Sequence, residues 1–213
     1  MKNNTLGKIS AAVTGISVAS FALAMLVSLA SGIYTAHVSF LASMFIAIGY
    51  VVFATAMVAC NKDKQALGTG LAGVAFAVVY ALLIFIVYYA MLTTVRMNSA
   101  LSDAALSIIS YESLGSLFFN YNLLGYGFMG LSTFFIGFQV RGKSKHSKAL
   151  RMLLWIHGVF FLSCLIMPMF PVFMPDMAGG ELIGTVVLLF WCAYFLPVCV
   201  LGWKYFRARE ANV

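Results

Sequence analysis

A small set of polar side chains clusters around the ends of two long apolar stretches. The set comprises Tyr88, Tyr89, Arg96, Asn120, Asn122 and Tyr126. A guanidinium group supplies positive charge for an anionic head group or small solute, and amides and phenols orient a ligand by hydrogen bonds. The sequence therefore predicts a polar pocket built around Arg96. In the plainer interpretation, the tyrosines form an aromatic belt at a membrane surface and Arg96 pairs with a nearby acid.

A second candidate is His157, the only histidine inside an apolar stretch. Ser132 lies in the preceding stretch at a similar depth, so the two side chains meet if the stretches pack together as helices. We expect a neutral imidazole that is hydrogen-bonded to a neighbouring helix, through Ser132 or Thr133, and we keep His157 among the candidate ligand-binding residues. An intramembrane hydrolase using Ser132 and His157 is an alternative.

The run Gly130-Leu131-Ser132-Thr133 resembles the serine motif of the rhomboid proteases, which are six-span intramembrane enzymes. The rest of the pattern differs. Thr133 stands where the family has a glycine, His157 lies on the fifth apolar stretch instead of the sixth, and no histidine or asparagine pair lies on the second to hold an oxyanion. We therefore expect no enzyme and no catalytic residue.

Cofactor and metal sites are not expected either. The four cysteines, Cys60, Cys164, Cys192 and Cys199, lie in or at the ends of apolar stretches without metal-ligand spacing. Two matches to G-x-G-x-x-G, at residues 68–73 and 125–130, lie inside apolar stretches instead of after a strand. The pattern there predicts close helix packing, not nucleotide binding.

Composition identifies the solvent of this fold as lipid. Of 213 residues, 63% are hydrophobic and only 9% are charged, which a soluble domain of this size does not accommodate. The formal net charge of +7 suits the anionic surface of a membrane, since the basic residues fall in short loops. Membrane lipid is the expected partner, and nucleic acid is not.

Six apolar stretches are long enough to cross a bilayer as helices, which takes about 20 residues. They lie near residues 9–30, 38–60, 67–95, 117–140, 152–170 and 182–203, and none contains Lys, Arg, Asp or Glu. Residues 101–110 show helical spacing of apolar side chains and predict a short helix on the outer membrane surface. The first stretch exceeds a signal-peptide core of about 7 to 15 residues, so we expect it to be retained; cleavage would leave five spans.

Twelve of the thirteen basic residues fall on one side of these stretches. They are Lys2, Lys8, Lys62, Lys64, Arg141, Lys143, Lys145, Lys148, Arg151, Lys204, Arg207 and Arg209. Basic loops stay on the cytoplasmic face during insertion. The sequence predicts an all-α bundle of six transmembrane helices, forming one domain over residues 1–213 with both termini cytoplasmic.

Three runs of residues carry a family resemblance. They are YYAMLTTVR at residues 88–96, FFNYNLLGYG at 118–127 and IHGVF at 156–160. The chain resembles, over its third to fifth stretches, a family of uncharacterised small multi-pass membrane proteins of bacteria that is defined as a domain of unknown function. The resemblance implies the topology and a bacterial plasma (inner) membrane, and it implies no activity or cofactor.

From these residues we expect a protein that binds or transports a small or lipid-like ligand through an outward-facing polar pocket. The alternative is a non-catalytic structural or regulatory partner of another membrane protein. Dedicated ion coupling is disfavoured, because no charged residue lies inside a predicted span and ion or proton paths usually need one.

Overall fold

The computed structural model describes residues 1–33, 35–61, 63–170 and 180–210, and every regular element within these ranges is helical. The α-helices are α1 Asn3–Ser31, α2 Ala36–Ala59, α3 Leu67–Ala90, α4 Asp103–Ile109, α5 Leu117–Gly137, α6 Lys145–His157, α7 Val159–Ile166 and α8 Gly180–Glu210. A 3₁₀ turn at Lys64–Ala66 and a π-helical turn at Met91–Val95 extend α3 at its two ends, and a 3₁₀ turn at Met167–Met169 extends α7.

Five helical segments are long and apolar enough to cross a membrane. They are Asn3–Ser31, Ala36–Ala59, Leu67–Val95, Lys145–Met169 and Leu182–Glu210. The chain is therefore a helical bundle with the character of a multi-pass membrane protein. The predicted fourth span at 117–140 forms α5 but is not among the five, so the count of six spans stays a prediction.

The reduced hydropathy of α5 follows from its position inside the bundle. It packs between α3 on one side and the α6–α7 segment on the other. Its glycines and its polar residues Asn122, Ser132 and Thr133 are buried against these neighbours and do not face lipid. A helix sheltered on both sides needs less apolar surface than one exposed to a bilayer.

Several predicted boundaries differ from the structure. The first helix begins at Asn3, not at 9. The fifth span begins at Lys145, not at 152, because Ser144 accepts a hydrogen bond from the Ser147 amide at 3.1 Å and so caps an amphipathic first turn. The same span is interrupted at Gly158, between α6 and α7. The last helix continues past residue 203 to Glu210. The predicted short helix at 101–110 is confirmed as α4.

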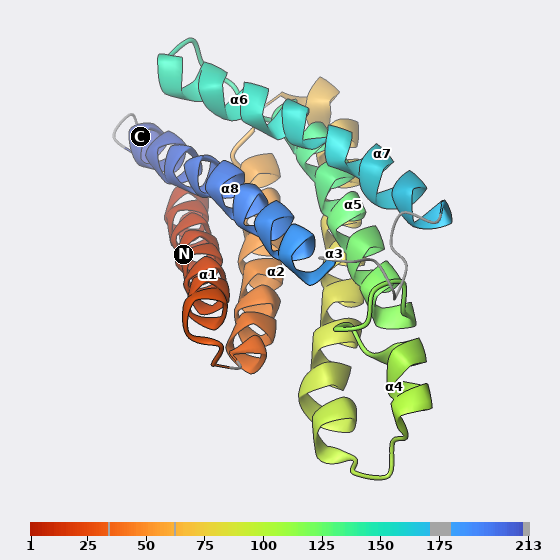
Figure 1. The fold of residues 1–213 in the computed structure, drawn as a ribbon. Coiled ribbons are helices and arrows are strands. Elements are labelled where there is room, and N and C mark those ends of the chain that lie inside the picture. The colour runs from red at the N-terminus through yellow and green to blue at the C-terminus, as the bar shows by residue number, and fades with distance from the viewer. Residues whose placement is uncertain (34, 62, 171–179, 211–213) are drawn as a thin grey trace.

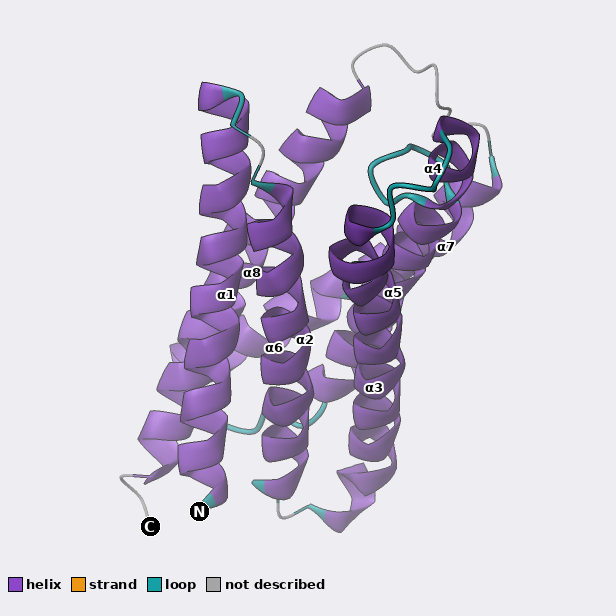
Figure 2. Ribbon diagram, turned by 90° about the horizontal axis from the view of Figure 1, so that it is seen from below, coloured by secondary structure: helices purple, strands orange, loops and turns teal. Residues whose placement is uncertain are grey.

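The helices form a row that two further segments cross. α1, α2, α3 and α5 stand side by side in that order, while α8 and the α6–α7 segment run across them (Figure 1). α8 packs on α1 and α6, and α6 and α7 pack on α5. Both chain termini lie at the same end of the bundle (Figure 2).

The basic segments converge on that end through specific contacts. Lys8 forms a salt bridge with Glu210, which joins the first helix to the last. The Arg209 guanidinium donates to the Cys60 carbonyl at 2.8 Å. Arg141 pairs with Asp63 at 2.7 Å, which joins the α5–α6 and α2–α3 connections. The one-sided charge pattern of the sequence is thus one physical surface; Lys62 lies outside the described residues.

Close helix packing explains the glycines of α5. A side chain at Gly130 would place its Cβ 3.0 Å from both the His157 carbonyl oxygen and the Phe161 amide nitrogen. A Cβ at Gly127 would lie 3.2 Å from the Cβ of Cys164. The prediction that the 125–130 glycines allow helices to approach one another is confirmed.

Candidate functional site

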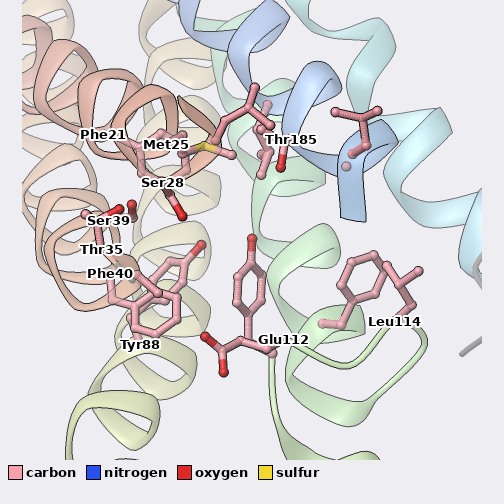
Figure 3. Close-up of a pocket in the computed structure, with 17 residues that line it drawn as sticks. Phe21, Met25, Ser28, Thr35, Ser39, Phe40, Tyr88, Glu112, Leu114 and Thr185 are labelled. Atoms are coloured by element: carbon pink, nitrogen blue, oxygen red, sulfur yellow. The ribbon is translucent and has the colours of Figure 1, made fainter. Parts of the chain in front are cut away.

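A cavity of about 670 Å³ lies at the end of the bundle opposite the chain termini. Its walls come from α1, α2, α3, α5, α8 and the turn before α5. The lining residues are Phe21, Met25, Ser28, Leu29, Thr35, Ala36, Ser39, Phe40, Tyr88, Tyr111, Glu112, Leu114, Phe119, Leu182, Gly184, Thr185 and Leu188. Figure 3 shows Met25 and Thr185 facing Tyr88 and Glu112 across this space. The volume suits a small-molecule ligand, for which pockets measure about 300 to 1,000 Å³.

The turn between α4 and α5 is held against the cavity by the π-helical turn of the third span. The Met91 sulfur accepts a hydrogen bond from the Tyr111 amide at 3.4 Å. Ser116 caps α5 by accepting from the Phe119 amide at 3.2 Å, and its hydroxyl donates to the Ser110 carbonyl at 2.5 Å. These bonds fix Tyr111 and Glu112 in the cavity wall.

Three aromatic rings meet beside this turn. The Tyr111 ring centroid lies 5.4 Å from that of Tyr88 and 5.6 Å from that of Phe40. Phe40 in turn stacks on Tyr88 with centroids 5.1 Å apart. Burial raises the pKa of the Tyr111 phenol. A hydrogen bond with Tyr88 lowers this pKa, and the neighbouring Glu112 carboxylate raises it, so the net shift is upward. Tyr111 is therefore a neutral hydrogen-bonding group at physiological pH.

The lining combines an apolar wall with hydroxyl groups and one acid. Most lining side chains are aliphatic or aromatic, and the hydroxyls come from Ser28, Thr35, Ser39, Thr185 and the two tyrosines. Glu112 is the only charged residue among the lining residues. Such a surface can bury an apolar chain and hydrogen-bond a polar head. It offers no positive charge to an anion.

The structure does not bring the seven predicted site residues into one site. Tyr88 lines the cavity. Arg96 is exposed just beyond the π-helical turn, and across the described ranges its side chain makes neither an ion pair nor a hydrogen bond. Tyr89 is 61% exposed on the outside of α3. Asn120 donates to the Gly115 carbonyl at 3.0 Å and so fixes the turn before α5.

Asn122 and Tyr126 lie deeper than the cavity, on the buried face of α5. Neither the carbonyl oxygen of the Asn122 side chain nor the Tyr126 hydroxyl has a hydrogen-bond partner among the described residues. The Tyr80 hydroxyl, across from Tyr126 on α3, is also without one. The Tyr80 and Tyr126 rings are 5.6 Å apart, so these groups form one buried cluster.

His157 lies away from the cavity, fully buried where α5, α6 and α8 meet. Its Nδ1 is 2.9 Å from the Thr133 hydroxyl, and its Nε2 accepts from the Trp191 indole at 3.0 Å. The expected hydrogen bond to a neighbouring helix is confirmed, with Thr133 as one partner. Both ring nitrogens are occupied, which is the usual state of a structural histidine in a membrane bundle.

Ser132 has different partners, so the Ser132–His157 dyad is not formed. The Ser132 hydroxyl donates to the Gly73 carbonyl at 2.6 Å and accepts from the Tyr50 hydroxyl at 2.8 Å. These bonds tie α5 to α2 and α3, on the side away from α6. Adjacent residues of a helix point in directions about 100° apart, so Ser132 and Thr133 serve different interfaces.

Sequence reasoning missed most of the cavity lining, including Ser39, Glu112 and Thr185. Each is a single polar residue at the end of a different helix or in a turn, so no spacing along the chain links them. One signal was present: Ser39 and Ser43 lie four residues apart on α2 and therefore share a face. In apolar helices such pairs usually mark packing, so the signal does not point to a cavity by itself.

Comparison with known proteins leaves the chain without a close counterpart. No family model, curated protein or solved structure matches it. The resemblance to small bacterial membrane proteins stays a prediction. Within the described ranges, no three His, Cys, Asp or Glu residues are grouped so that they could hold a metal ion.

Proposed function

We propose that this chain is a six-span protein of a bacterial inner membrane that binds a lipid-like amphipathic molecule in its outward-facing cavity, either to hold it or to move it. The observation that carries the proposal is the cavity of about 670 Å³ with an apolar wall and a scattering of hydroxyls. An amphipath has the matching chemistry, because its chain buries apolar surface while its head satisfies the hydroxyls.

The rim of the cavity supports entry from the membrane. Leu29 of α1 and Leu182 of α8 line the cavity and are 53% and 55% exposed. In a bilayer, such exposed leucines face lipid tails. An apolar rim lets a lipid chain pass from the bilayer into the cavity without crossing water.

Two observations support the topology. The basic segments meet on one surface at the end that carries both termini, and basic surfaces stay cytoplasmic. The helix α5 is sheltered by α3, α6 and α7, so its modest hydropathy is compatible with a sixth span. With both termini cytoplasmic, the cavity opens on the outer half of the membrane.

A cavity-filling substitution tests the proposal. Gly184 lines the cavity, and a Cβ built there meets nothing within 4 Å, so the cavity wall has room for the ring of Gly184→Phe. Gly68 near the cytoplasmic end is equally open, which makes Gly68→Phe the matched control. Native mass spectrometry of the purified proteins should detect a lipid-like adduct in the parent and in the Gly68→Phe variant but not in the Gly184→Phe variant. No adduct in any of the three would favour the structural-partner function instead.

A further inference from the structure

Directly beneath the cavity, three helices each place a polar residue about one turn below a lining residue. On α2, Ser43 follows Ser39 by four residues; on α5, Asn122 follows Phe119 by three. On α8, Cys192 follows Leu188 by four. Since one helical turn rises 5.4 Å, these residues form a layer just beneath the cavity lining, to which none of them belongs. Tyr126, one turn deeper on α5, and Tyr80 complete it; we call the five polar residues Ser43, Tyr80, Asn122, Tyr126 and Cys192 the polar floor.

The polar floor carries hydrogen-bonding capacity that the described part of the protein does not use. Asn122 is 3% exposed and its side chain makes no hydrogen bond within the described ranges. Tyr80 and Tyr126 are 0% and 7% exposed, and their hydroxyls make no hydrogen bond of good geometry there, although the Tyr126 hydroxyl lies near those of Tyr80 and Ser43. Ser43 uses its own proton on the Ser39 carbonyl, at 3.0 Å, so its oxygen remains able to accept.

Unsatisfied polar groups at this depth are costly. A buried donor or acceptor without a partner costs about 1 to 3 kcal/mol, and the low dielectric of a membrane interior does not relieve that cost. By contrast, Ser132, Thr133 and His157, one to three turns further along the bundle, all have partners. Three of the five unmet groups in the described residues lie in the polar floor; the other two, Arg151 Nε and Trp155 Nε1, lie on α6.

The chemistry of the floor selects the head group. Asn122 provides both a donor and an acceptor, and the phenols do the same. None of the five floor residues is a Lys, Arg, Asp or Glu, so a charged head would be desolvated without a counter-ion. Hydroxyl, ester or amide heads lose far less by desolvation than a charged head does, and they match both kinds of partner.

We propose that the polar floor is the head-group subsite of the cavity and that it takes an amphipath with a single chain and an uncharged, hydroxyl- or carbonyl-bearing head. This inference rests on the proposed function and adds the substrate class to it. The head hydrogen-bonds Asn122 and Tyr126, while the chain lies along the apolar wall formed by Phe21, Met25 and Leu188. The Glu112 carboxylate in the wall disfavours a fatty-acid carboxylate at the same site.

Three probes of equal chain length separate the head groups: a monoacylglycerol, the corresponding fatty acid and the corresponding alkylamine. Their dissociation constants are measured on the detergent-solubilised full chain. We expect the monoacylglycerol to bind at least about tenfold more tightly than either charged probe, which corresponds to about 1.4 kcal/mol. A preference for the alkylamine that disappears in Glu112→Gln would place the head in the cavity wall and overturn the inference. This comparison of the three probes uses only the parent protein, so it does not depend on whether a variant of the polar floor folds.

Floor variants give the second readout. Asn122→Leu and Tyr126→Phe should each weaken monoacylglycerol binding about 5- to 10-fold and leave the affinity for the charged probes unchanged. The control is Tyr121→Phe, on the exposed side of α5, which should change none of the affinities. Because Asn122→Leu removes an unmet amide, its melting temperature in the absence of ligand should not fall. If the monoacylglycerol binds equally well to all variants, the floor is not the subsite, although the cavity still binds. If no probe binds the parent protein, the proposed function and the inference both fail.

Discussion

The indole N–H of Trp191 donates to Nε2 of His157 across 3.0 Å, and this single contact fixes the protonation of the imidazole. An indole nitrogen is only a donor, so Nε2 must carry the lone pair and Nδ1 the proton. Nδ1 then donates to the Thr133 hydroxyl at 2.9 Å, which in turn donates to the Gly130 carbonyl at 2.7 Å. Hydrogen bonds running in one direction thus join α8, α6 and α5 through a neutral histidine.

The first prediction concerns this chain of hydrogen bonds. His157→Gln keeps a polar head and should lower the melting temperature in detergent less than His157→Leu. Each interhelical hydrogen bond lost in a membrane bundle costs about 0.6 to 2 kcal/mol, so both variants should still insert. Trp191→Phe, which removes only the indole donor, should resemble His157→Gln. A His157→Leu variant as stable as the parent would contradict the structural role.

The second prediction concerns Ser132. Because its hydroxyl is held between Tyr50 and Gly73, we expect no labelling by fluorophosphonate probes in membranes. Ser132→Ala and Tyr50→Phe should each destabilise the protein by about 0.6 to 2 kcal/mol. The double variant should cost less than the sum, since both remove the same bond. Labelling of Ser132 that is lost in His157→Gln would instead indicate a hydrolase.

The third prediction compares two glycines. Gly130→Ala forces a methyl group to within 3.0 Å of backbone atoms of α7 and the end of α6, so thermal unfolding should occur at a clearly lower temperature. Gly68→Ala meets nothing within 4 Å and lies in the first turn of α3, where alanine is favoured over glycine by up to about 1 kcal/mol. Its melting temperature should be unchanged or higher. Equal behaviour of the two variants would mean that the α5–α7 contact is looser than described.

The fourth prediction is topological. A fluorescent protein fused after Val213 should be bright and a phosphatase fused there inactive, because basic segments such as the one that carries Arg207 and Arg209 are retained in the cytoplasm during insertion. A phosphatase fused within the α3–α5 connection, after Asn98, should be active. The reverse pattern at either position would rule out six spans with cytoplasmic termini.

The helices were predictable from the sequence, whereas the site was only partly so. Apolar length alone predicts α1, α2, α3 and α8, because a bilayer demands about 20 apolar residues from any exposed helix. The need for glycine at 158 depends on a tertiary contact instead: a Cβ there would lie 2.8 Å from the Cβ of Phe134 on a neighbouring helix. No local pattern encodes that contact.

Arg96 shows where the predicted pocket and the cavity differ. Its isolation among the basic residues suggested a held charge, yet the side chain is exposed and does not line the cavity. The cavity is bounded by residues as far apart as Phe21 and Leu188, which meet only because α8 returns to pack on α1. Tyr88 was identified because it lies near a helix end, where aromatic belts and ligand pockets use the same residue types.

Photo-crosslinking tests most directly whether the cavity binds a lipid-like molecule. A monoacylglycerol with a diazirine in its chain is irradiated with the protein in membranes, and the modified residues are located by mass spectrometry. Labels should concentrate on the cavity wall, at residues 21–29 and 182–188, and should be lost in the Gly184→Phe variant but not in the Gly68→Phe variant. Labels spread over lipid-facing positions such as Leu82 and Ile86, unchanged in Gly184→Phe, would show that the cavity binds no such molecule.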